Sequence, residues 1–181
     1  MVHLDIDAQK ELLALARKTL EWFIATGEVP DHKPERPELH QESGAFVSLH
    51  CGDELRGCIG LIKPAGPLYQ TVQQCAVSAA SEDYRFDRVS SEELPDIRIE
   101  ISVLSPMERT KDTSEIAVGK HGLYVVRGQR RGLLLPQVAT EWGWDREAFL
   151  AQTCQKAGLE ETAWRDPATA IYQFQAQVFS E

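Results

Sequence analysis

The chain has 181 residues, of which 43% are hydrophobic and 26% charged, and its formal net charge at pH 7 is −9. This size and composition are typical of one globular domain, here residues 1–181, that buries a core without disulfides or a structural metal. An acidic chain without a basic block lacks the charge pattern of proteins that bind nucleic acids or anionic membranes.

The apolar segments and the first residues of the chain predict the compartment in which the protein is located. No apolar run in the sequence approaches the ~20 residues that a membrane span needs. Residues 1–5 lack the basic and apolar segments of a signal peptide. A cytoplasmic protein without structural disulfides is therefore expected.

The first predicted element is a helix. Apolar residues recur at helical spacing over residues 8–26, and Gly27 suits the left-handed residue that ends a helix. Asp5 or Asp7 can cap its amino terminus. Residues 29–42 carry three prolines among charged residues and predict a surface loop.

A β-hairpin is predicted over residues 45–60, because two strand-like runs flank the turn pair Gly52-Asp53. In this register Cys58 and Arg56 share one face of the hairpin, opposite two apolar residues of the first strand, Val47 and Leu49 respectively. Gly57 lies between them, and a glycine inside a strand marks a bulge or a close approach to the backbone. The hairpin thus brings a thiol and a guanidinium together beside bare backbone.

The four cysteines fit no short-spaced zinc pattern. In the predicted register Cys51 lies opposite Glu54, which separates its sulfur from that of Cys58 by roughly 13 Å along the strands. That distance is too long for a disulfide. Cys75 and Cys154 fall on the apolar stripes of predicted helices and are expected to be buried free thiols. Cys58 is predicted to be a lone thiol.

The rest of the chain alternates short helices and hairpins. The patterns predict a helix over residues 67–81, a strand over 97–104, a hairpin joining 123–126 to 133–136, helices over 137–142 and 145–158, and a strand over 170–179. Hairpins dominate and β-α-β alternation is missing. This order favours an α+β fold with a largely antiparallel or mixed sheet and packed helices.

Two more residues are candidates for chemistry. Glu100 lies in the middle of the strand over 97–104, where a carboxylate on a covered face must be paired or functional. If that face is open to water, Arg98 and Glu100 are simply its solvated side. His121 lies between two glycines directly before a predicted strand, a position from which loops often present catalytic side chains.

Six motifs follow one another along the chain: LRGCIG at 55–60, DYRF at 83–86, IEISVLSP at 99–106, GKHGL at 119–123, GLLLPQVA at 132–139, and CQKAGL at 154–159 followed by Trp164. This set resembles the AMMECR family, whose prokaryotic members are also called AmmeMemoRadiSam system protein A. The resemblance implies a compact α+β protein with two intimately packed parts and no settled activity. It also implies association with a Memo-like protein, which resembles non-haem-iron dioxygenases, and with a radical S-adenosylmethionine protein.

One hypothesis is a thiol-dependent enzyme. Cys58 would be the nucleophile, His121 its base, and Glu100 the group that orients the histidine. Arg56 and Arg85 would hold the carboxylate or phosphate of a small anionic substrate.

A second hypothesis is an accessory or ligand-binding component that makes no bond itself. In it Arg56, Cys58, Glu100 and His121 would line a ligand or partner groove. The candidate ligand-binding residues from the motifs are Arg56, Gly57, Arg85 and Gln137. The family association with a Memo-like protein favours this hypothesis. The motifs identify no cofactor and no oligomeric state.

Two other interpretations remain. A metal site could use Cys58, His121, Glu100 and perhaps His50, since these side chains ligate zinc or iron. The predicted register disfavours it, because His50 and Cys58 face opposite ways, and no metal is assigned. Alternatively Arg56 braces the hairpin through carbonyl groups, and His121 is a hydrogen-bonded turn residue.

Overall fold

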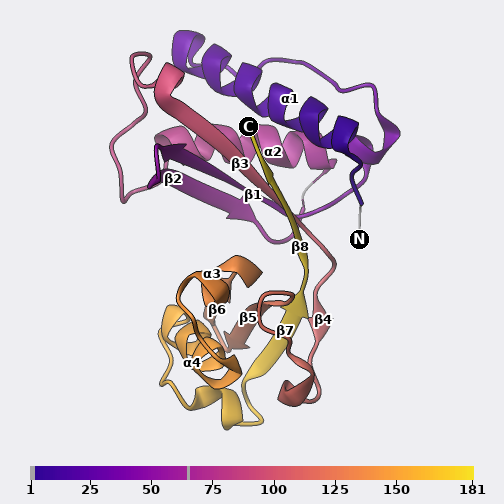
Figure 1. Cartoon of the computed structure of the whole chain (residues 1–181), viewed down its shortest axis with the longest axis vertical. Coiled ribbons are helices and arrows are strands. Elements are labelled where there is room, and N and C mark those ends of the chain that lie inside the picture. Colours follow the sequence, from indigo (N-terminus) through magenta and orange to yellow (C-terminus); the bar gives the residue numbers. More distant parts are fainter. Residues whose placement is uncertain (1–2, 65) are drawn as a thin grey trace. The chain divides into compact units, whose positions relative to one another are not determined.

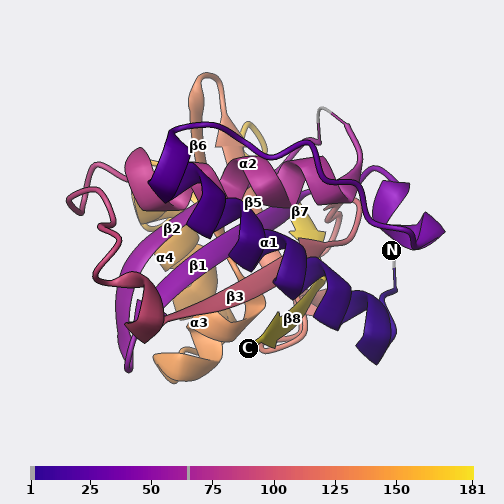
Figure 2. The same ribbon diagram turned by 90° about the horizontal axis from the view of Figure 1, so that it is seen from above.

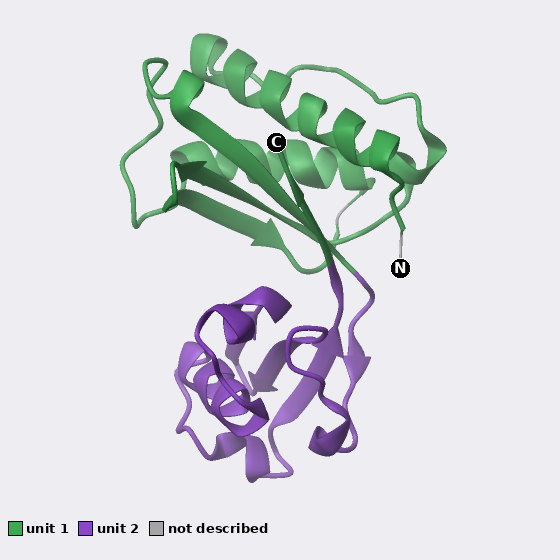
Figure 3. Ribbon diagram, viewed as in Figure 1, with its two compact units in different colours: residues 1–104, 177–181 green, residues 105–176 purple. Residues whose placement is uncertain are grey.

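The computed structural model describes residues 3–64 and 66–181, and the chain folds into two compact units (Figure 3). Unit 1 comprises residues 1–104 and 177–181, and unit 2 comprises residues 105–176. Unit 2 is therefore an insertion between two strands of unit 1. Each unit has helices and its own four-stranded sheet, so the predicted α+β class is confirmed.

In its described residues, unit 1 has two α-helices over one face of a sheet with strand order β2-β1-β3-β8 (Figures 1 and 2). Its elements are α1 (Ile6–Thr26), β1 (Ala45–Cys51), β2 (Glu54–Leu61), α2 (Leu68–Ser81), β3 (Ile97–Leu104) and β8 (Ala176–Ser180), with 3₁₀ turns at Pro37–His40 and Leu94–Asp96. The Asp5 carboxylate caps α1 by accepting the Ala8 N–H, and Gly27 ends the helix with φ 78°.

The core of unit 1 lies between the helices and the sheet. Alternate residues of β3 are buried against the helices, as their period of two predicts, and Arg98 and Glu100 point to the other face. On β1 the same inner face carries Val47 and Leu49, both fully buried. The inner face is therefore apolar throughout, while the outer face carries polar side chains.

The hairpin register differs from the prediction. Cys51 lies opposite Glu54, as predicted, but the pairing shifts between Leu49 and His50, so that Cys58 lies opposite Ser48 and not Val47. Arg56 is the extra residue of this β-bulge, because Leu49 pairs with Gly57. The one-residue shift turns every side chain beyond the bulge to the opposite face.

Two consequences of the bulge correct the sequence analysis. Cys58 lies on the outer face with Ser48, while Gly57 turns to the helices. His50, two residues from Ser48 on β1, shares the outer face with Cys58 instead of facing away from it.

Unit 2 has a sheet of order β4-β7-β5-β6 packed with two helices. Its elements are β4 (Glu108–Arg109), β5 (Gly122–Arg127), β6 (Arg130–Leu134), α3 (Pro136–Glu141), α4 (Arg146–Lys156) and β7 (Ala170–Phe174), with 3₁₀ turns at Thr113–Glu115 and Ala163–Arg165. Asp145 caps α4, and the helix buries Phe149, Leu150 and Cys154 in the core of this unit.

The last predicted strand is two strands. Residues 170–179 split at Gln175 into β7, which belongs to the sheet of unit 2, and β8, which belongs to that of unit 1. At Gln175, Ser105 satisfies the backbone groups that a neighbouring strand would otherwise bond. The Ser105 N–H donates to the Gln175 carbonyl, and Ser105 Oγ accepts the Gln175 N–H at 2.8 Å. Alternating polarity alone did not reveal the change of sheet.

In the described part of the chain, no helix is both long and apolar enough to cross a membrane. All four cysteines are free, as predicted: Cys75 and Cys154 are buried, Cys51 is exposed, and Cys58 is half-buried.

Candidate functional site

The backbone of Cys58 is held by two side chains from the DYRF motif. β2 is an edge strand, and the N–H and C=O of Cys58 point away from β1. The N–H donates to Asp83 Oδ2 at 2.9 Å, and the carbonyl accepts a hydrogen bond from Arg85 Nη2 at 3.3 Å. Asp83 and Arg85 therefore take the place of a neighbouring strand at this residue.

Asp83 organises this clamp. Its carboxylate also accepts hydrogen bonds from the Arg85 backbone N–H, Nε and Nη2 at 3.2, 2.9 and 2.7 Å. The residue is only 4% exposed. The hydrogen bonds from Arg85 are the largest cause of a lowered pKa, about 2, which keeps the carboxylate ionised. A buried charge with this many donors fixes the loop rigidly on Cys58.

Tyr84 is held between the two clamp residues and yet is 96% exposed. The Arg85 guanidinium lies over the Phe86 ring, 5.3 Å from its centroid. The DYRF motif thus places an exposed aromatic side chain on a loop that hydrogen bonds hold next to Cys58.

The Cys58 thiol belongs to a row of polar side chains on the outer face of the sheet. Ser48 lies between Cys58 on β2 and Glu100 on β3, and its hydroxyl donates to Cys58 Sγ at 3.2 Å. Burial raises the pKa of the Cys58 thiol, while the Ser48 hydrogen bond and the Arg85 charge partly oppose this rise. The thiol is therefore protonated at neutral pH.

Arg56 braces the hairpin against the loop that follows α2. Its Nε and Nη2 donate to the Glu93 carboxylate at 2.7 and 3.2 Å, and Nη1 donates to the Asp87 carbonyl at 2.8 Å. Glu93 also accepts the Ser90 N–H at 2.8 Å, as its capping-box spacing predicts. These bonds occupy the guanidinium that the sequence analysis assigned to an anionic ligand.

Gly57 faces α2. A Cβ atom at this position would lie 2.2 Å from the Ala79 carbonyl oxygen. The missing side chain therefore lets the helix backbone approach the strand, and the space beside Gly57 is filled by α2.

His121 belongs to unit 2. Its Nδ1 accepts the Ala117 N–H at 3.2 Å, so the neutral ring carries its proton on Nε2. Burial is the main cause that lowers the pKa of His121. It lines a small cavity of about 40 Å³ together with Gln173, whose buried Oε1 has no hydrogen-bond partner among the described residues.

The predicted site residues divide between the units. Unit 1 brings together Cys58, Glu100 and Arg85, while His121 and Gln137 belong to unit 2. Gln137 lies in the first turn of α3, and its Oε1 is buried without a partner in the described structure. Among residues 3–64 and 66–181, no three His, Cys, Asp or Glu side chains lie close enough to hold a metal ion.

Sequence reasoning missed several residues that build the site. Asp83, Tyr84, Ser48 and Glu93 were not singled out as site residues, although the DYRF motif was recognised. The available signal for the clamp was an aspartate two residues before an arginine, Asp83 and Arg85, in the motif that follows LRGCIG.

The fold and the site define an α+β protein with two units, the second inserted in sequence between β3 and β8 of the first, and with a clamped cysteine on the edge strand β2. A family model described as AMMECR1 matches residues 13–179. The chain belongs to the AMMECR1 family.

Relatives support this assignment along nearly the whole chain. A protein of Methanothermobacter thermautotrophicus is 46% identical over 187 residues, which cover 98% of this chain and 96% of the relative. Protein PF1979 of Pyrococcus furiosus is 44% identical, with 94% and 86% covered. The crystal structure of the uncharacterized protein PH0010 from Pyrococcus horikoshii matches with a TM-score of 0.90 and 41% identity, covering 94% of this chain and 89% of the other.

Proposed function

We propose that this protein is a binding component that presents the Cys58 hairpin and the DYRF loop to a protein partner and makes no covalent bond itself. The observation that carries the proposal is Tyr84, a 96% exposed aromatic residue on a loop that Asp83 and Arg85 fix to the Cys58 backbone. Exposed Tyr and Arg residues on a rigid backbone are the residue types that dominate protein interfaces, because little conformational entropy is lost on binding.

The protonation states of the candidate catalytic groups support a binding role. A cysteine nucleophile reacts as its thiolate, and burial opposes formation of that thiolate at Cys58. A histidine base needs a free ring nitrogen, and the hydrogen bond from Ala117 occupies Nδ1 of His121. Neither the thiol of Cys58 nor the imidazole of His121 is therefore in the form that would react as a nucleophile or a base.

The proposed partner is the Memo-like protein, with the radical S-adenosylmethionine protein in the same pathway or complex. Support comes from the family association that the six motifs imply. Arg85 and Glu100 would supply charged contacts, and Tyr84 the central aromatic contact.

The test is a binding measurement by biolayer interferometry against the Memo-like protein encoded in the same genome, at physiological salt. We expect binding that Tyr84→Ala weakens by about tenfold or more, as truncation of a central interface tyrosine does. Trp142→Ala is the matched control, because Trp142 is a 70% exposed aromatic residue of unit 2. Absence of binding, or equal loss in the two variants, would contradict the proposal.

A thiol-dependent enzyme acting on a small anion is the second candidate, with Cys58 as nucleophile and His121 as base. One observation favours it: the Arg85 charge lies close enough to lower the pKa of the Cys58 thiol against the effect of burial. Turnover of an identified substrate that is lost in Cys58→Ala and retained in Cys51→Ala would establish this candidate in place of the first.

A further inference from the structure

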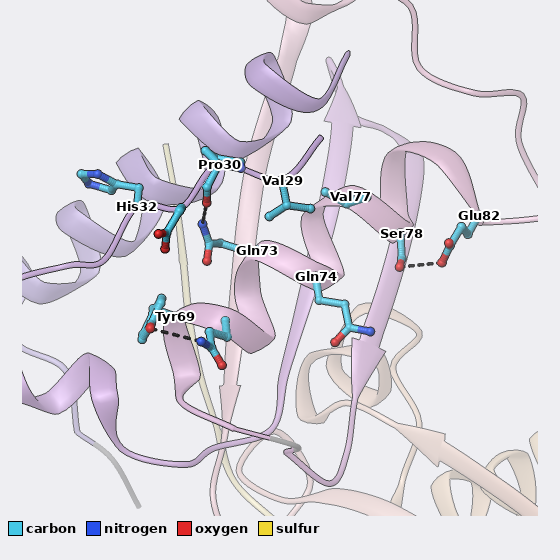
Figure 4. Close-up of a pocket in the computed structure, with 11 residues that line it drawn as sticks. Val29, Pro30, His32, Tyr69, Gln73, Gln74, Val77, Ser78 and Glu82 are labelled. Atoms are coloured by element: carbon cyan, nitrogen blue, oxygen red, sulfur yellow. Dashed lines mark hydrogen bonds between the residues drawn. The ribbon is translucent and has the colours of Figure 1, made fainter. Parts of the chain in front are cut away.

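A cavity of about 450 Å³ lies in unit 1, away from the Cys58 hairpin, between α2 and the segment at residues 29–32 (Figure 4). This volume falls in the range of sites for small ligands or single side chains. None of the residues discussed above as candidate site residues lines it.

Gln73 supplies a fixed hydrogen-bond acceptor in this cavity. The residue is only 5% exposed. Its Nε2 donates to the Pro30 carbonyl at 3.2 Å and to Thr19 Oγ1 at 3.4 Å, which uses both amide protons and sets the orientation of the amide. Figure 4 shows the amide nitrogen directed at Pro30 and the oxygen turned away from it. In the described structure, this oxygen accepts no hydrogen bond.

The charges around the cavity have one sign apart from a histidine. Asp31 and Glu82 both line it, and no lysine or arginine is among its lining residues. Ser78 Oγ donates to the Glu82 carboxylate at 2.6 Å and so orients it. Two carboxylates and an unpaired amide oxygen form a set of acceptors, which calls for a ligand that donates hydrogen bonds and carries positive charge.

The wall between these acceptors is apolar. Val29, Pro30 and Val77 line it, and Figure 4 places Val29 and Val77 between Gln73 and Ser78. An aliphatic stem would lie against this wall with a charged end at the acceptors on one side of it, as the stems of lysine and arginine do on protein surfaces.

We propose that this cavity binds an aliphatic ammonium or guanidinium group. The group belongs either to a free amine or to a lysine or arginine side chain of a protein partner. The acidic chain, with its net charge of −9, favours the approach of such cations.

Isothermal titration calorimetry on the full chain tests the proposal with agmatine and spermidine as free amines and acetyl-arginine amide as the side-chain probe. The uncharged controls are 1,4-butanediol and acetyl-citrulline amide. We expect the cations to bind and the uncharged controls not to bind, with affinity that falls as salt concentration rises. Tighter binding of agmatine assigns the site to free amines, and tighter binding of acetyl-arginine amide assigns it to a partner side chain.

Asp31→Asn and Glu82→Gln remove one charge each while keeping side-chain shape, and both residues are exposed, so folding should be preserved. Each is expected to weaken binding by about fivefold, the upper range for one solvent-accessible ion pair. Glu92→Gln, an exposed acidic residue outside the cavity, should leave binding unchanged. The proposal is overturned if no cation binds, if the uncharged controls bind equally, or if Glu92→Gln weakens binding as much as Glu82→Gln.

Discussion

Side chains on the two faces of the unit 1 sheet make different kinds of contact, as two adjacent residues of β2 show. Gly57 faces α2, where its missing side chain admits the Ala79 carbonyl. Cys58 faces the other way, and its thiol contacts Ser48 in a row that continues to Glu100. On the helix face the packing of volumes decides which residue fits, whereas on the outer face hydrogen bonds and charges decide.

This difference explains why three such different residues follow one another in the LRGCIG motif. Three successive residues serve three separate contacts: Arg56 reaches the loop after α2, Gly57 the helix backbone, and Cys58 the polar face. The bulge makes this possible, because it redirects Arg56 out of the ladder. Variants on the two faces should therefore fail in different ways.

The largest effect is expected on the helix face. In Gly57→Ala the new Cβ atom would meet backbone at 2.2 Å, so strand and helix must separate. The free energy of unfolding, measured by urea denaturation, should fall by roughly 3 kcal/mol or more. Gly52→Ala is the control: Gly52 has φ 61° and open space around it. Its backbone strain should cost only about 1–2 kcal/mol. An equal loss in both variants would contradict the packing argument.

The clamp should show the next largest effect. Asp83→Asn keeps the shape but removes the charge that accepts hydrogen bonds from Cys58 and Arg85. Hydrogen bonds to charged groups stabilise by roughly 1.5–3 kcal/mol, and a loss of this size is expected in urea denaturation. Asp87→Asn, at an exposed position in the same loop, should change stability little. A stable Asp83→Asn variant would mean that the loop does not depend on the clamp.

Acid should weaken the Asp83 clamp and the contact between Glu93 and Arg56. The pKa of Asp83 is about 2 in the folded chain, below its ordinary value, and that of Glu93 is also lowered to about 2. A lowered pKa contributes stability that is complete above roughly pH 4 and is lost as pH falls toward 2, by roughly 2 kcal/mol for Asp83. The free energy of unfolding, measured from pH 7 to pH 2, should show this loss, and the Asp83→Asn variant should show a smaller loss.

Arg56→Lys tests the brace on the bulge. A lysine keeps the charge but cannot bond to the Glu93 carboxylate and the Asp87 carbonyl together, as the guanidinium does. A loss of about 1–2 kcal/mol in the free energy of unfolding is expected, the size of the contribution of one or two hydrogen bonds. Arg88→Lys, an exposed residue of the same loop, is the control, and similar losses in both variants would rule out a specific brace.

The smallest effect concerns thiol reactivity and not stability. Cys51 is exposed, whereas Cys58 is half-buried with a raised pKa. Iodoacetamide at pH 7 should therefore modify Cys51 first, and modification of Cys58, followed by mass spectrometry of peptides, should accelerate only in alkaline solution. Cys51→Ser should remove the fast phase. Fast modification of Cys58 at pH 7 would favour the thiol-enzyme alternative.

Much of the fold followed from local patterns. The strand over residues 97–104 has the predicted bounds, Asp5 and Asp145 cap the predicted helices, and Cys75 and Cys154 are buried thiols. These features depend on periodicity and capping, which involve residues close in sequence. The candidate site was less predictable, because Asp83 and Glu93 act on a hairpin some thirty residues earlier, and sequence spacing does not reveal such contacts.

By itself the sequence determined the α+β class, most of the helices and strands, and the AMMECR1 family motifs. Each of these depends on local residue patterns or on the order of motifs along the chain. Only the tertiary structure decided the face on which Cys58 lies, the division of residues 170–179 between two sheets, and the pairing of Asp83 and Arg85 with the Cys58 backbone. The physical reason is common to all three. Each depends on how segments distant in the sequence pair with one another, and that is settled only when the sheets assemble.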